Sequence, residues 1–265
     1  MNCKNCNKIL NDTQKYCDEC GAKVIQNRLT PKVLAIQVNQ EFLSLDNKFL
    51  RTLICLFTTP EDVIGGFIDG TRKKYINAIT YYAISLTLLG FQMFLLKQFF
   101  SEFLEPQFEA FKETFKVSGT GNNNPFANSA DFFSNSQGIF FSVLMPFIAI
   151  GTWLIYLDKR KYNYTEHLVI NLYITAQTIF VNFVVITIMA VFNVFDYLIA
   201  SIIITPPLIL YGAYIFKRLY NLSYINSLIR YIGAYIIYTI VFSIIMVIIL
   251  VIAVIYLFAT GKLNI

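Results

Sequence analysis

The run from Tyr231 to Ala259 reads YIGAYIIYTIVFSIIMVIILVIAVIYLFA and contains no Asp, Glu, Lys or Arg. The hydrocarbon core of a bilayer is about 30 Å thick, and a helix needs about 20 apolar residues to cross it. The run is long enough for that crossing and predicts a tilted or protruding span. Four further apolar segments are predicted to span, and they cover 76–96, 138–157, 168–192 and 197–216.

The composition of the whole chain agrees with these five spans. Of the 265 residues, 56% are hydrophobic and 14% are charged, whereas an ordinary soluble domain carries roughly 25% charge. We therefore predict an all-α polytopic membrane protein with five transmembrane helices. Pro146 is expected to bend the second span, and Pro206-Pro207 to kink the fourth.

The basic residues predict the orientation of the spans. If the N-terminus is cytoplasmic, that side holds seventeen Lys and Arg residues and the other side holds four. The cluster Arg72-Lys73-Lys74 lies directly before the first span, where such charges weigh most. We predict a multi-pass protein of the cell inner (cytoplasmic) membrane, with a cytoplasmic N-terminus and an external C-terminus. Because the net charge of +5 is explained by topology, we expect no nucleic-acid partner.

Two cysteine pairs stand at the start of the chain, Cys3-x-x-Cys6 and Cys17-x-x-Cys20. Two such pairs can complete a four-thiolate tetrahedral site, the closed arrangement of structural zinc. Gly21 and Asn7, which follow the second cysteine of each pair, both tolerate positive φ. The alternatives are two disulfides, which need an oxidising compartment, or a redox pair, which normally lies in a βαβ context. We predict a zinc ribbon that binds Zn²⁺ for structure.

The domain organisation follows from these features. We predict a zinc ribbon over 1–27, cytoplasmic amphipathic helices over 28–75, and a five-helix membrane domain over 76–265 with an external loop at 97–137. Within 31–70 the apolar stripe fits either interfacial helices on the bilayer or helices packed on the bundle. Thr59 is expected to cap a short helix that ends near Gly70.

Catalytic groups are scarce in the predicted spans, whose central parts contain no Asp, Glu, Lys or Arg. No nucleophile–base pair, HExxH helix or phosphate-binding Gly loop is present. The lone His167 is expected to be interfacial. An intramembrane enzyme would need Glu166, His167 and Asp158 to meet in one cytoplasmic pocket. We therefore predict no catalytic residues and a non-enzymatic protein.

Three neutral amides fall on the third predicted span, namely Asn171, Gln177 and Asn182. Such groups commonly form hydrogen bonds between helices in a membrane. The functional alternative is a polar site in the bundle, which would make the protein a transporter or a lipid-handling protein that uses a polar face of this span.

The N-terminal part resembles an uncharacterised family of bacterial membrane proteins in which a four-cysteine ribbon precedes a helix and the first span. The matching residues are Cys3, Cys6, Cys17, Cys20 and Gly21, then Thr52, Leu53, Leu56 and Pro60, then Gly70, Arg72 and Tyr75. Thr71 and Asn77 depart from the family pattern, which usually has Lys and Pro there. The five-span layout also resembles, in topology, the Yip family of membrane-trafficking proteins. Neither resemblance implies a reaction.

Together these features predict an integral membrane protein with a cytoplasmic zinc-ribbon module for interaction or assembly. Its expected partners are the lipid bilayer and a protein bound through the ribbon. Association into a homo-oligomer is a further candidate that the sequence does not decide.

Overall fold

The protein is described from a computed structural model, which covers residues 2–11, 13–14, 16–22, 24, 30–32, 48–71, 73–100, 136–192 and 197–259. The chain divides into two compact units, Met1–Lys48 and Phe49–Ile265, which are described separately. Within the described residues the regular structure is helical, apart from isolated bridge pairing such as Asn2 with Ile9.

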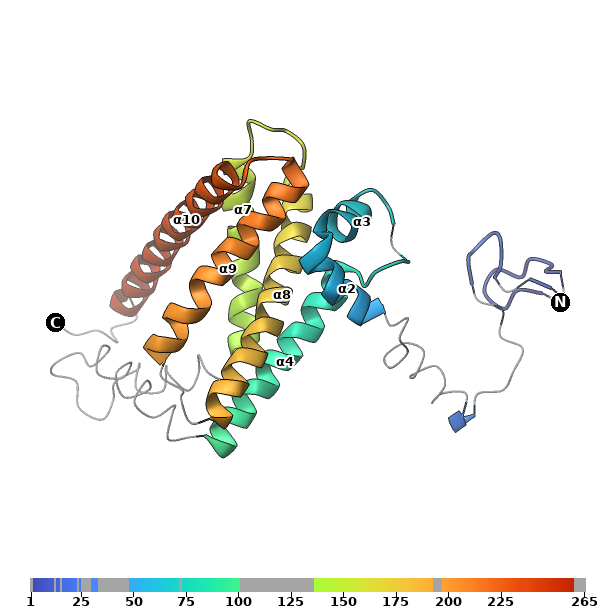
Figure 1. The fold of residues 1–265 in the computed structure, drawn as a ribbon, viewed down its shortest axis with the longest axis horizontal. Helices are drawn as coiled ribbons and strands as arrows, with labels where there is room; N and C mark the ends of the chain where they lie inside the picture. The colour runs from blue at the N-terminus through green and yellow to red at the C-terminus, as the bar shows by residue number, and fades with distance from the viewer. Residues whose placement is uncertain are drawn as a thin grey trace. The chain divides into compact units, whose positions relative to one another are not determined.

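Five long helices make up most of the second unit (Figure 1). They are α4 (Ala78–Phe99), α7 (Gln137–Ile155), α8 (Tyr164–Val191), α9 (Tyr197–Tyr220) and α10 (Tyr224–Ala259). In the part of the chain that the structure describes, these five helices are long and apolar enough to cross a membrane. The predicted all-α, five-span fold is confirmed. Helices α7 and α9 both continue through their internal prolines.

Two of the helices begin earlier than the sequence predicted. Helix α8 starts at Tyr164 because Asn163 and Glu166 form a capping box: the Asn163 side chain accepts from the Glu166 N–H at 2.9 Å, and the Glu166 carboxylate accepts from the Asn163 N–H at 2.7 Å. Helix α10 starts at Tyr224, directly after Ser223. The Ser223 Oγ atom accepts a hydrogen bond from the backbone N–H of Asn226 at 3.4 Å. Apolarity alone cannot locate such starts, because the capping residues are polar.

Helix α8 packs most extensively against α4 and α7, and α10 packs against α7 and α9. Glycines permit the closest approaches. A Cβ on Gly151 would lie 2.5 Å from the carbonyl oxygen of Ala234, and a Cβ on Gly212 would overlap the ring of Tyr231. One continuous core joins all five long helices and also includes the short helices that precede them in sequence.

Those short helices are α2 (Lys48–Thr58), a π-helical turn η2 (Glu61–Gly65) and α3 (Gly66–Ile68), and they lie beside α4, α8 and α9 (Figure 1). The turn η2 begins after Pro60, and the Asp62 N–H donates to the Thr59 carbonyl at 3.1 Å. A capping role of the Thr59 hydroxyl stays a prediction. Gly70 adopts φ +100°, which ends the segment where the sequence predicted.

Several predictions lie outside the described residues. They concern the apolar stripe over 33–47, the linker over 25–29, nearly all of the external loop and the last residues of the chain.

Candidate metal centre and buried polar residues

Each cysteine pair lies on a knuckle with the same backbone hydrogen bonds. In the first knuckle the Cys3 N–H donates to Lys8 O and the Asn7 N–H donates to Cys3 O, both at 2.8 Å. In the second the Cys17 N–H donates to Ala22 O at 2.8 Å and the Gly21 N–H donates to Cys17 O at 2.9 Å. Asn7 and Gly21 adopt φ of 61° and 69°, so both predicted positive-φ positions are confirmed.

The two knuckles bring four sulfur atoms together, those of Cys3, Cys6, Cys17 and Cys20. All of them lie within 4.8 Å of one another. The closest approaches cross between the knuckles: Cys3 to Cys20 and Cys6 to Cys17 are each 3.6 Å apart. A disulfide needs about 2.05 Å, whereas zinc–sulfur bonds of about 2.3 Å in a tetrahedron place the sulfurs about 3.8 Å apart. The arrangement therefore fits a metal ion better than a pair of disulfides.

Charged side chains join the outer parts of the two knuckles. The Lys8 Nζ atom lies 3.0 Å from the Asp18 carboxylate and 3.5 Å from that of Glu19. The Lys8 ammonium lowers the pKa of Asp18 below its ordinary value. Because these groups are exposed, the ion pairs align the knuckles without adding much stability. Their effect is to hold Lys8, next to the first thiol pair, against the loop that carries the second.

Gln177, near the middle of α8, is fully buried and joins three helices. Its Oε1 atom accepts a 2.5 Å hydrogen bond from the Tyr81 hydroxyl on α4, and its Nε2 atom donates to the Leu53 carbonyl on α2 at 3.1 Å. Both ends of the amide are thus used to bond other helices.

Asn171 and His167, on the first turns of α8, belong to a second buried network. The Asn171 Nδ2 atom donates to Thr152 Oγ1 on α7 at 2.8 Å, and His167 Nδ1 lies 3.2 Å from the same oxygen. On the other side of the imidazole, Nε2 lies 2.8 Å from the Tyr220 hydroxyl of α9. Every donor meets an acceptor if Nδ1 carries the proton and the Tyr220 hydroxyl donates to Nε2.

The three amides of α8 do not form one polar face. Gln177 bonds to α2 and α4, whereas Asn171 bonds to α7. Asn182 is half-buried and lies eleven residues beyond Asn171, about three turns along the same face. Asn171 and Gln177 therefore act as interhelical hydrogen-bonding groups, which does not favour the transporter or lipid-handling alternative.

The groups that an intramembrane enzyme would need are also engaged separately. Glu166 caps α8, and Asp158 accepts from Arg230 Nη1 at 2.7 Å and from Nη2 at 2.9 Å. The Arg230 guanidinium lowers the pKa of Asp158. His167 is 1% exposed and is enclosed by aromatic rings, those of Phe216 and Tyr220 on α9 and of Tyr156 just after α7. Its expected position at the membrane interface stays a prediction.

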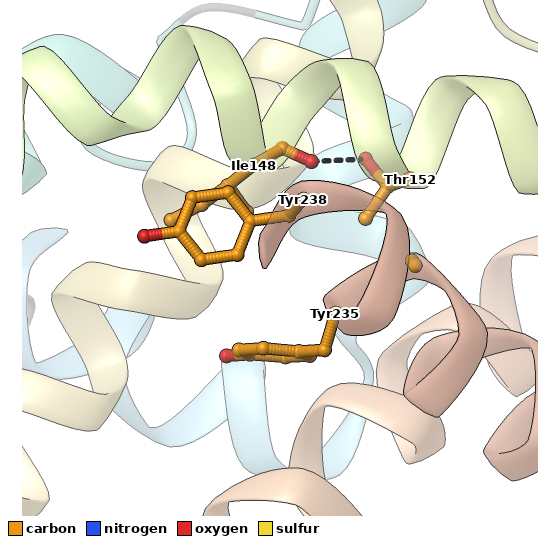
Figure 2. A pocket seen from close by; sticks show the side chains of 5 residues that line it. Ile148, Thr152, Tyr235 and Tyr238 are labelled. Carbon is orange, nitrogen blue, oxygen red and sulfur yellow. Dashed lines mark hydrogen bonds between the residues drawn. The ribbon is translucent and has the colours of Figure 1, made fainter. Parts of the chain in front are cut away.

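A hollow between α7 and α10 is shown in Figure 2. Ile148, Thr152, Ala234, Tyr235 and Tyr238 line it, and it holds about 160 Å³ of empty space, open solvent included. The Thr152 hydroxyl is hydrogen bonded to the Ile148 carbonyl of its own helix (Figure 2). Ligand pockets usually measure about 300–1,000 Å³, so this hollow is too small for such a ligand.

The sequence did not identify two polar contacts between helices, Arg230 with Asp158 and Arg218 with Glu61. Each joins a charged residue at the predicted cytoplasmic end of a span to an acid far away in sequence. The only signal was the presence of opposite charges beside spans, and a single sequence cannot pair them.

Comparison with known proteins gives one match. Residues 46–90, from just before α2 into α4, are similar to a family described as protein of unknown function (DUF3667). This segment contains Thr52, Leu53, Leu56, Pro60, Gly70, Arg72 and Tyr75, the part of the quoted resemblance that follows the cysteines. Neither the curated proteins nor the solved structures gave a match.

Proposed function

We propose that this membrane protein carries a structural zinc ion on a cytoplasmic ribbon, and that the ribbon is a module for protein interaction or assembly. One observation carries the proposal: four thiols converge within the first compact unit of the chain, whereas the five long helices belong to the second. The protein acts without catalysing a reaction. The metal-bound ribbon supplies the surface, and the spans keep it at the membrane.

The donor set supports zinc as the metal. Four cysteine sulfurs are typical of structural Zn²⁺ sites, in which every coordination position is filled. Cys3, Cys6, Cys17 and Cys20 would hold the ion as thiolates. The ion would supply cross-linking of the two knuckles, and it would leave no position for a substrate. A role in structure rather than in catalysis follows.

The surface of the ribbon supports an interaction role. Cys3, Leu10 and Cys17 form its buried cluster, whereas Ile9 is 80% exposed and Tyr16 is 54% exposed. Large apolar side chains on the surface of a small unit can contribute to a binding interface, in which Tyr is enriched. Ile9 follows the first knuckle and Tyr16 precedes the second.

Affinity purification in a mild detergent tests this role. Cys17→Ser should remove one ligand and reduce recovery of the proteins that co-purify with the wild type. The double variant Ile9→Asp, Tyr16→Asp should lose the same proteins while it keeps its zinc, as measured by elemental analysis. Full recovery of every partner with both variants would refute the interaction role.

A cytoplasmic ribbon also requires the orientation predicted from the basic residues, with the inner membrane as the location. Labelling of intact cells with a membrane-impermeant maleimide tests it in a background without native cysteines. A cysteine at Arg160, in the loop between α7 and α8, should react only after the cells are opened. A cysteine at Lys97, in the last turn of α4, should react in intact cells. The opposite pattern would exclude a cytoplasmic ribbon.

A further inference from the structure

Helix α2 carries an exposed apolar stripe opposite its buried face, and the Phe57 ring at one end of the stripe also contacts the Tyr211 ring of α9 at 5.4 Å between centroids. Leu50, Ile54 and Phe57 are 46%, 57% and 43% exposed, and their spacing places them on one face. The opposite face, with Thr52 and Leu56, is fully buried against the core. The helix is therefore apolar toward its surroundings as well as toward the protein.

The carbonyl groups at the end of α2 are bonded to the protein itself. The last four carbonyls of a helix lack partners within the helix, and in water the solvent can satisfy them. Here side chains of the spans reach two of the last carbonyls: the Tyr211 hydroxyl donates to Leu56 O at 3.2 Å and the Tyr214 hydroxyl donates to Thr58 O at 3.1 Å. One turn earlier, Gln177 bonds to Leu53 O. Inside a bilayer, backbone groups must find such partners because no water is present.

The positions of these partners show that α2 lies against the sides of the spans. Gln177 lies thirteen residues after the start of α8, about 20 Å along the helix axis, and Tyr211 lies nine residues before the end of α9, about 14 Å. A helix that only covered the cytoplasmic ends of the bundle would contact the first or last turns of these spans instead.

Helices that pack against α2 also expose large apolar side chains. Ile79 in the first turn of α4 is 74% exposed, and Leu210 of α9, next to the Tyr211 that bonds α2, is 43% exposed. Both charged side chains of α2, Lys48 and Arg51, are basic. Such a pattern suits the boundary between acyl chains and anionic headgroups.

We infer that α2 lies within one leaflet of the bilayer, with Leu50, Ile54 and Phe57 in contact with lipid acyl chains. The segment similar to the family of unknown function then contains a half-inserted helix and the first part of the span α4, and is not a cytoplasmic domain. The partner of this surface is the acyl region of the leaflet in which α4 begins. This inference is independent of the metal on the ribbon.

Quenching of tryptophan fluorescence by brominated lipids tests the inference. Trp153 is the only tryptophan, so Ile54→Trp in a Trp153→Phe background reports on α2 alone. The protein would be placed in phosphatidylcholine–phosphatidylglycerol nanodiscs with bromine at a shallow or a deep acyl position. Two further single-tryptophan variants serve as references, Ile240→Trp on α10 and Tyr16→Trp on the ribbon. In the native protein the side chains at both positions are 54% exposed.

We expect the shallow bromines to quench the fluorescence of Ile54→Trp. The extent of quenching should be comparable with that of Ile240→Trp by brominated lipid, and iodide in the buffer should not quench the tryptophan at position 54. The ribbon reference should respond to iodide and not to bromine. If Ile54→Trp ignores both bromine positions, the inference is overturned, whether iodide quenches it (water) or does not (a protein partner or a second copy).

A second measurement avoids the Trp153 substitution. Ile54→Asp in the otherwise native chain should lower the melting temperature in nanodiscs, because a carboxylate would enter the acyl region. Ile9→Asp on the ribbon, at a site 80% exposed, is the control and should leave the melting of the membrane helices unchanged. Equal melting of the two variants would also overturn the inference.

Discussion

The two units of this chain are held together in different ways. In the ribbon, the buried cluster consists of Cys3, Leu10 and Cys17, and short backbone hydrogen bonds shape two knuckles around four sulfurs. In the helical unit, one core runs through every long helix, and buried amides, hydroxyls and an imidazole bond across helix pairs. Among its described residues the first unit buries few apolar groups, and small units of this kind commonly need a metal to fold. Helices in lipid depend instead on packing and on internal hydrogen bonds.

The largest expected effect comes from removing the metal. A chelator, or Cys17→Ser, should unfold the ribbon, because metal binding supplies roughly 10 kcal/mol or more of folding free energy in units of this kind. Limited proteolysis should then cut within the first 27 residues, and zinc content should fall to background.

The comparison between the units supplies the control for this experiment. The same treatment should leave the thermal unfolding of the membrane helices unchanged, as measured by circular dichroism in detergent. An equal loss of stability in both units would show that the ribbon is part of the membrane core. A ribbon that resists protease without metal would show that its apolar cluster is sufficient to keep it folded.

The next largest effect is expected at Gln177, where the helical unit depends on a single amide. Gln177→Leu leaves the Tyr81 hydroxyl and the Leu53 carbonyl without their partner, and we expect a loss of about 3 kcal/mol in stability. The measurement is thermal unfolding in detergent. Asn182→Leu is the matched control on the same helix; its side chain is half-buried, and its cost should be much smaller. Equal costs would contradict the role of Gln177 as the junction of α2, α4 and α8.

Close helix packing in the second unit is tested at its glycines. Gly212→Ala places a methyl group where the buried ring of Tyr231 lies, and we expect it to cost about 2 kcal/mol. Gly90→Ala on α4 meets nothing within 4 Å and should be neutral or slightly stabilising, because Ala favours a helix. Unfolding temperatures of the two variants measure the difference. A tolerated Gly212→Ala would show that the Tyr231 ring can move aside without loss of stability.

The knuckles of the first unit and the membrane spans of the second were predictable from the sequence, because each depends on residues that are close together in the chain. The spacing of the four cysteines, with Asn7 and Gly21 at positive φ, defined the knuckles. The long apolar runs defined the five spans. Both signals are readable because they arise from a few adjacent residues, or from the solvent in which a whole segment lies.

Contacts between distant residues were not predictable in the same way. The burial of His167 depends on Thr152, Phe216 and Tyr220, which belong to two other helices. The Asn171, Gln177 and Asn182 set looked like one polar face, yet Asn171 and Gln177 point toward different helices. A single sequence shows which groups need partners, and only the packing of the helices shows which partners they find.

The smallest expected effect concerns pH, and it again separates the two units. Arg218 Nε donates to Glu61 Oε2 at 3.0 Å, and its Nη2 bonds to Oε1, so the Arg218 guanidinium holds the pKa of Glu61 below its ordinary value of 4.5. Because the folded pKa is lowered, the pair contributes stability above the unfolded pKa, and this contribution is lost as the pH falls through the folded pKa. For a partly exposed pair we expect less than about 1 kcal/mol.

Melting of the membrane helices should therefore be measured for wild type and Glu61→Gln, from neutral pH down to about pH 3. The wild type should melt higher at neutral pH, and the gap should close in acid. Asp18→Asn is the matched control: Lys8 also lowers the pKa of Asp18, but that pair is in the ribbon, so the melting of the helices should not change at any pH. A gap for Glu61→Gln that persists unchanged in acid would mean that Glu61 stabilises the η2 turn by something other than its charge.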